Sequence, residues 1–127
     1  AQFAHSAMTG EDIVLHTTGT SCGNYVYTAD AATAIFTLLK KGASGECYTV
    51  ANETSSMQIK DMAALVANCV ADGKIKVVID VPEGDKFGYA PDVKLKLDAS
   101  KLRSLGWKPQ INLEESYKRL IKYWKEN

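Results

Sequence analysis

The chain has 127 residues, a hydrophobic share of 46%, and fifteen basic residues against fifteen acidic ones. This length fits a single domain, residues 1–127, with enough apolar residues for a core. The balanced charge provides no electrostatic footprint for nucleic acid or an anionic membrane, and no apolar run approaches the ~20 residues of a membrane span. The three cysteines form no paired motif, which favours reduced thiols in a cytoplasmic protein. Cys47 is expected to be a small buried side chain.

The first half of the chain alternates predicted strands and helices. Residues 13–15 predict a short strand and residues 25–28 a second one, with Asp30 expected to cap the helix that follows. That helix repeats apolar residues at helical spacing and stops at Gly42. Residues 47–51 then predict a third strand.

The second half continues the alternation. Ser55 and Gln58 stand at the spacing of a capping box before a second helix. The apolar face of that helix is expected to be Ile59, Met62, Ala63, Val66 and Val70. Residues 75–81 alternate apolar and charged side chains, which predicts a strand with one wet face. A loop is predicted over 83–93. The last helix, after Asn112, is expected to bury Leu113, Tyr117, Leu120, Ile121 and Trp124 on one face.

Three kinds of functional motif are absent from the sequence. The nine glycines form no G-x-G-x-x-G pattern, which a dinucleotide cradle needs so that the backbone can approach a pyrophosphate. None of the six tyrosines is followed four positions later by a lysine. His5 and His16 have no cysteine or carboxylate at metal-ligand spacing, so we expect no metal site.

Three segments occur in the order seen in a known family. They are NYVYTADAATAI at 24–35, GECYTVANE at 45–53, and LDASKL followed by LGWKP at 97–109. From about residue 13 onward, the chain resembles the C-terminal end of the extended short-chain dehydrogenase/reductase family. Members of this family are NAD-dependent epimerases, dehydratases and decarboxylases that act on nucleotide sugars.

The resemblance implies a parent enzyme with a Rossmann domain that binds NAD and a smaller domain that binds the nucleotide sugar. This chain is expected to be the C-terminal portion, an α/β fold with a small mixed sheet and three to four helices, without the Rossmann core. The opening at Ala1, which is no natural start, favours the same interpretation. Since the glycine fingerprint and the family's catalytic Tyr-x-x-x-Lys are absent, we expect no NAD binding and no turnover by this portion alone.

Several alternatives stay open at this stage. The sequence does not separate an epimerase, which is an isomerase, from a dehydratase, which is a lyase, or from a decarboxylase or reductase. A non-catalytic binding or interaction module with the same fold is the other class of function. By the resemblance, the helix after residue 28 packs on the missing domain. The chain alone is therefore expected to expose an apolar face and to associate through it. The sequence is also compatible with a parent protein that forms a homo-oligomer.

Three candidate substrate-binding residues follow from the resemblance. Lys94 stands where relatives often carry an arginine that meets the diphosphate, and its alternative is a solvated lysine. Asn52 stands where relatives often place an asparagine facing the nucleotide, and its alternative is an ordinary turn residue. Tyr89 offers a face on which a base or ribose stacks, and its alternative is packing on its own domain. Gly23 departs from the family, whose members commonly carry a phosphate-binding arginine there.

Overall fold

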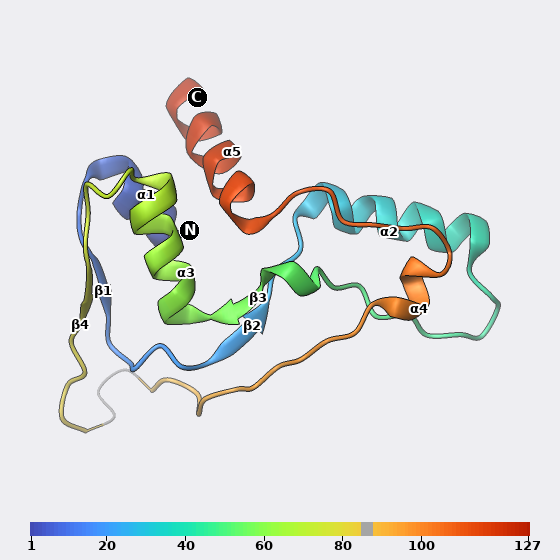
Figure 1. Cartoon of the computed structure of the whole chain (residues 1–127), viewed down its shortest axis with the longest axis horizontal. Helices are drawn as coiled ribbons and strands as arrows, with labels where there is room; N and C mark the ends of the chain where they lie inside the picture. The colour runs from blue at the N-terminus through green and yellow to red at the C-terminus, as the bar shows by residue number, and fades with distance from the viewer. Residues whose placement is uncertain (85–87) are drawn as a thin grey trace.

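The computed structural model describes residues 1–84 and 88–127, so residues 85–87 of the predicted loop lie outside the described residues. The helices and strands lie in two lobes joined by a short strand pair (Figure 1). In chain order they are α1 (Gln2–Thr9), β1 (Ile13–Leu15), β2 (Cys22–Asn24), α2 (Thr28–Lys41), the 3-10 turn η1 (Glu53–Ser55), β3 (Ser56–Gln58), α3 (Ile59–Leu65), its π-helical continuation η2 (Val66–Val70), β4 (Val77–Ile79), α4 (Ser100–Arg103) and α5 (Leu113–Glu126).

The strands form two separate two-stranded sheets. β1 and β4 are parallel, with Ile13 opposite Val77. β2 and β3 are antiparallel, with Cys22 opposite Gln58, and a parallel bridge also joins Cys22 to Lys94. Parallel and antiparallel pairing therefore both occur, as predicted, and they are divided between two small sheets.

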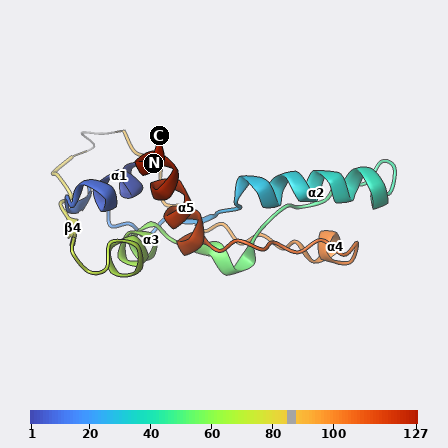
Figure 2. The same ribbon diagram turned by 90° about the horizontal axis from the view of Figure 1, so that it is seen from above.

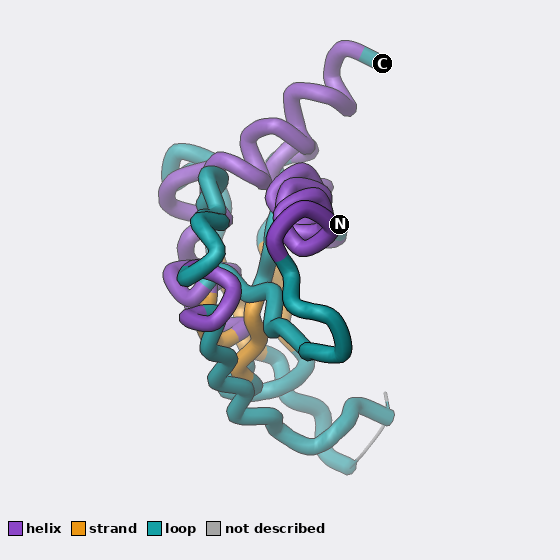
Figure 3. Tube along the Cα trace, turned by 90° about the vertical axis from the view of Figure 1, so that its right-hand side faces the viewer, coloured by secondary structure: helices purple, strands orange, loops and turns teal. Residues whose placement is uncertain are grey.

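The first lobe has its own apolar core between α1, α3, η2 and the β1–β4 pair. Its buried residues are Ile13, Leu15, Ala63, Val66, Ala67, Ala71 and Ile75. The helix predicted from Ile59 to Val70 is thus confirmed, although its last turn is π-helical. α5 packs on η2 and α1 through the buried Ile121, and its C-terminal end projects away from the strands (Figure 3).

The second lobe has a smaller core beneath α2. It consists of Ala34, Ala51, Ala99, Leu102 and Trp107. Trp107 anchors this core, because it is buried and its indole Nε1 donates to the Asp30 carbonyl oxygen at 3.1 Å. Figure 2 shows α2 standing well clear of the first lobe. Its outer face is exposed at Ile35 (57%), Phe36 (69%) and Leu39 (79%), which confirms the expected apolar surface.

Two predictions for the segment that leads into α2 are wrong: the position of its strand and the role of Asp30. The strand lies at Cys22–Asn24, not at 25–28, because 22–24 are the residues that pair with β3. Asp30 does not cap α2, whose N-cap residue is Tyr27. The buried Asp30 carboxylate instead accepts hydrogen bonds from the backbone N–H groups of Gln110 and Ile111, at 3.1 and 2.9 Å.

Three further local predictions need correction. Residues 47–51 form no strand, because no described segment forms a ladder with them, and Cys47 is exposed. Ser55 and Gln58 form no capping box, because Ser55 ends η1 and α3 begins only after β3. The strand predicted at 75–81 shortens to β4, and Ile79 on its apolar face is 55% exposed. None of the described helices is long and apolar enough to cross a bilayer.

Candidate substrate site

Two cavities flank the segment that contains Tyr89 and Lys94. The first has a volume of about 760 Å³, and its lining includes Cys22, Gln58, Glu53, Lys94, Lys96 and Asp98. We call it the Lys94 cavity. The second has a volume of about 310 Å³, and its lining includes Phe3, His16, Ser21, Tyr89 and Asp92. We call it the Tyr89 cavity. The structure therefore places Lys94 and Tyr89 in neighbouring but different cavities.

The Lys94 cavity lies over one face of a three-stranded ribbon. The Cys22 N–H donates to the Val93 carbonyl at 2.6 Å, and the Leu95 N–H donates to the Cys22 carbonyl at 3.3 Å, so this segment extends the β2–β3 pair. Residues directly opposite each other in such a ribbon share a face. Cys22 is opposite both Gln58 and Lys94, and all three line the cavity.

Gly23 faces the other side of this ribbon, because side chains alternate along a strand. A Cβ atom added to Gly23 would lie 2.9 Å from the Tyr25 hydroxyl oxygen. Burial, with a contribution from Cys22, raises the pKa of the Tyr25 phenol. An arginine at position 23 would therefore start beneath Tyr25, on the face away from Lys94, and its absence leaves no gap in the Lys94 cavity.

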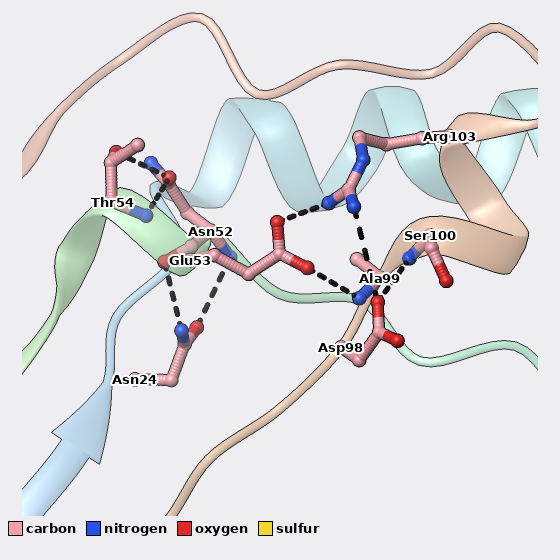
Figure 4. Close-up of polar contacts among 8 residues, drawn as sticks. All are labelled: Asn24, Asn52, Glu53, Thr54, Asp98, Ala99, Ser100 and Arg103. Carbon is pink, nitrogen blue, oxygen red and sulfur yellow. Dashed lines mark hydrogen bonds and ion pairs between the residues drawn. The ribbon is translucent and has the colours of Figure 1, made fainter.

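The two carboxylates of the Lys94 cavity are both engaged (Figure 4). Glu53 accepts from the Ala99 N–H at 2.9 Å and forms an ion pair with Arg103. Asp98 accepts from the Ser100 N–H at 2.8 Å, and that hydrogen bond, together with Arg103 at 3.9 Å, lowers the pKa of Asp98. Within residues 1–84 and 88–127, no ion pair engages Lys94 or Lys96.

Asn52 lies in a buried polar junction and lines neither cavity. It is 3% exposed, its Oδ1 accepts from the Thr54 N–H and hydroxyl, and its Nδ2 donates to the Ile111 carbonyl at 3.3 Å. Its backbone exchanges two hydrogen bonds with the Asn24 carboxamide, at 2.8 and 3.1 Å. The amide of Asn52 thus joins parts of this chain, and its role at a nucleotide stays a prediction without a contact to support it.

Tyr89 is 53% exposed in the Tyr89 cavity. His16, at the end of β1, lines the same cavity and is oriented by its Nδ1, which lies 3.2 Å from the Asp80 carbonyl oxygen. Since a carbonyl only accepts, Nδ1 carries the proton in this contact. The Tyr89 cavity thus combines aromatic rings with polar groups, which suits a base or a ribose.

Sequence reasoning missed the Glu53–Arg103 pair and the position of Lys96 in the Lys94 cavity. Glu53 and Arg103 are 50 residues apart, so no local pattern joins them. Lys96 did carry a signal, because residues two apart in an extended segment share a face. Asp98 accepts from the Ser100 N–H, although α4 has Ala99 at its N-cap position.

The comparisons with curated proteins find nucleotide-sugar enzymes. dTDP-D-glucose 4,6-dehydratase from Bos taurus is 28% identical over 116 residues, which cover 89% of this chain and 32% of that protein. The human dTDP-D-glucose 4,6-dehydratase is 27% identical over the same share of each chain. A trifunctional UDP-glucose 4,6-dehydratase/UDP-4-keto-6-deoxy-D-glucose 3,5-epimerase/UDP-4-keto-L-rhamnose-reductase from Arabidopsis thaliana is 27% identical over 99% of this chain and 18% of its own. Over most of its length this chain is similar to part of these nucleotide-sugar enzymes, as the resemblance to extended short-chain dehydrogenases/reductases led us to expect.

Solved structures of this enzyme class share the fold. dTDP-glucose 4,6-dehydratase from Bacillus anthracis, in complex with NAD, has a TM-score of 0.74 at 17% identity and covers 99% of this chain and 38% of its own. UDP-glucose 4-epimerase from Thermotoga maritima, with UDP-glucose, has a TM-score of 0.74 at 21% identity, covering 98% and 38%. No family model matches the chain. The chain spans about a third of the length of the dehydratases, and the predicted family resemblance is confirmed.

Proposed function

We propose that residues 1–127 form the nucleotide-sugar-binding domain of an NAD-dependent sugar-nucleotide dehydratase or epimerase. The observation that carries this proposal is the homology to dTDP-D-glucose 4,6-dehydratases over 89% of the chain. In this role the domain binds the remote nucleotide and orients the sugar, and that binding energy lowers the barrier of a reaction whose catalytic groups lie elsewhere. No residue of this chain is assigned a catalytic role.

The residues of this chain do not fit NAD itself. A dinucleotide cradle needs a glycine-rich turn between a strand and the N-terminus of a helix. The turn from β2 to α2 runs from Tyr25 to Tyr27 without a glycine, and the space above Gly23 in the preceding strand meets the Tyr25 hydroxyl. We therefore assign NAD to a Rossmann domain supplied by the rest of the protein.

The exposed face of α2 is the proposed contact with that Rossmann domain. Ile35, Phe36 and Leu39 are all more than half exposed, and a contiguous apolar surface of this kind marks an interface. About two thirds of each relative's length lies outside the part that this chain matches, which is enough to supply the covering domain.

Within the domain, we assign the diphosphate to Lys94 and the base or ribose to Tyr89. The Lys94 cavity contains a cation that no described ion pair neutralises, and the Tyr89 cavity contains aromatic side chains. The segment from Tyr89 to Asp98 borders both cavities, and in this assignment the ligand extends along it from one cavity to the other. A charge-assisted contact between Lys94 and a phosphate oxygen then fixes the ligand's position.

Titration with NAD tests whether NAD binds outside this chain, as we propose. We expect calorimetry to detect no stoichiometric NAD binding to the 127-residue chain, and tight binding by the protein with its natural upstream sequence. That upstream sequence should contain the glycine fingerprint and Tyr-x-x-x-Lys. Tight NAD binding by the 127-residue chain alone, or an upstream sequence without these motifs, would refute the proposal.

A further inference from the structure

We propose that the Lys94 cavity is a two-cation site, in which Lys96 joins Lys94 on the ligand's diphosphate and Arg103 keeps both lysines available. Arg103 is a positioning residue here, since it lines neither cavity. This inference rests on the proposed function and extends it to residues that neither the homology nor the sequence motifs single out.

The Lys94 cavity has the size and the lining of a small-molecule site. Its volume of about 760 Å³ lies within the roughly 300–1,000 Å³ of small-molecule sites. Lys94 and Lys96 both line it, from the segment that pairs with β2. Ser56 and Gln58 line it from β3, so neutral hydrogen-bonding groups stand on the neighbouring strand.

The charged side chains of the Lys94 cavity do not neutralise one another. The cavity is lined by two lysines and two carboxylates, Glu53 and Asp98, which would cancel if they paired with each other. They do not pair in this structure. Both Glu53 oxygens are occupied, by the Ala99 N–H and by Arg103, while Asp98 faces Ser100 and Arg103. The carboxylates of the cavity therefore do not neutralise the charges of the two lysines, which remain available to an external anion.

The lysines of the chain differ in whether they form ion pairs. Lys101, Lys118 and Lys122 lie in ion pairs with glutamates, while others, such as Lys60 and Lys108, form none among the described residues. Lys94 and Lys96 form none with any described residue, although two carboxylates share their cavity. A diphosphate presents clustered anionic oxygens, which suit two point charges on one wall.

The test measures the affinity of the protein with its natural upstream sequence for UDP, TDP and inorganic pyrophosphate. Lys96→Ala should weaken UDP or TDP binding about fivefold to tenfold, because one charge-assisted contact is lost, and should reduce its salt dependence. Lys108→Ala is the matched control, since Lys108 is exposed and lines neither cavity. An effect of Lys96→Ala no larger than that of Lys108→Ala would overturn the two-cation site.

Arg103 provides the sharper arm of the test. Arg103→Met should weaken binding about threefold or more, because Glu53 is then free to pair with Lys94 or Lys96. Adding Glu53→Gln should restore affinity to within about twofold of wild type, whereas a merely structural role of Arg103 predicts no rescue. Failure of the double variant to recover would overturn the role of Arg103.

The outcomes also separate this inference from the proposed function. Loss of affinity in Lys94→Ala with wild-type affinity in Lys96→Ala would overturn the two-cation site alone. A wild-type protein that binds neither UDP nor TDP would overturn the proposed function as well. Pyrophosphate binding that weakens in parallel with UDP binding would support the assignment of the cavity to the diphosphate.

Discussion

At the scale of a single residue, the neighbouring Tyr25 explains why position 23 is a glycine. The backbone of Gly23 is not in the left-handed region, so conformational freedom is not the reason for a glycine here. The reason is space, since an added Cβ would meet the Tyr25 hydroxyl oxygen at 2.9 Å and Cζ at 3.1 Å. Introducing an arginine at position 23 therefore requires Tyr25 to move, and we expect no gain in phosphate binding from Gly23→Arg.

Substitution of Gly23 tests this steric explanation. Gly23→Ala should destabilise the chain by roughly 1–3 kcal/mol, the usual effect of overpacking, and Tyr25→Phe should recover part of that loss by removing the hydroxyl. The measurement is urea unfolding of the single and double variants. Tyr123→Phe is the control, since Tyr123 is 63% exposed on α5. Equal stability of Gly23→Ala and wild type would show that the space is not limiting.

Two phenols should also titrate late. Burial raises the pKa of both Tyr25 and Tyr117. Cys22 adds to the shift of Tyr25, and Tyr25 adds to that of Tyr117. Because the folded pKa exceeds the unfolded value of about 10, the stability linked to these groups is fully present below pH 10 and is lost as the pH rises through the folded values. Tyrosinate absorbance should show Tyr117→Phe removing a late-ionising group, and alkaline unfolding should become less steep. An unchanged late phase would contradict this.

At the scale of elements, Asp30 and Trp107 hold α2 against the segment before α5. The buried Asp30 carboxylate accepts from two backbone N–H groups, and the Trp107 indole donates to the Asp30 carbonyl and to the Thr33 hydroxyl. These contacts matter because the second core is small. A carboxylate that looked like a helix cap in the sequence therefore connects two segments about 80 residues apart.

Removal of this carboxylate should loosen α2. Asp30→Ala leaves two backbone donors without their acceptor, which should cost about 2–4 kcal/mol of unfolding free energy. Asp61→Ala, at an exposed position in the first turn of α3, is the control and should cost much less. Hydrogen exchange should show faster exchange in α2 of the Asp30 variant, while α3 keeps its protection. A loss no greater than that of Asp61→Ala would contradict the assigned role.

Three of the helices were predictable from the sequence because their signals are local, whereas α1 was not predicted. α2, the α3–η2 helix and α5 each repeat apolar residues at helical spacing, and Gly42 and Asn112 mark two of their boundaries correctly. The strands were less predictable because pairing depends on distant segments. Residues 47–51 have strand-like composition but no described partner, and the site wall depends on the Glu53–Arg103 pair between distant segments.

At the scale of the whole molecule, the protein has two small apolar cores and one helix, α2, whose apolar outer face is exposed to solvent. The cores are separate clusters of buried residues, and the polar contacts of Asn24, Asn52 and Asp30 join the segments between them. The uncovered helix is α2, with its three exposed apolar residues. The architecture is consistent with a domain that packs on another one.

The uncovered face should drive self-association of the isolated chain. Because large exposed apolar patches favour association, sedimentation velocity should show concentration-dependent oligomers. Phe36→Ser combined with Leu39→Ser should shift the chain toward monomer. Tyr123→Ser removes an exposed aromatic ring elsewhere and should not do so. A monodisperse wild-type monomer at high concentration would argue against this use of α2.

The most direct test of the central claim compares two ligands in one variant of the protein with its natural upstream sequence. In Lys94→Ala, the account predicts that affinity for a UDP- or TDP-sugar falls about tenfold or more, the loss expected for a charge-assisted phosphate contact, while NAD affinity stays at the wild-type value. Lys108→Ala should change neither. Unchanged nucleotide-sugar affinity in Lys94→Ala, or an equal fall in NAD affinity, would contradict the claim that this domain holds the nucleotide sugar.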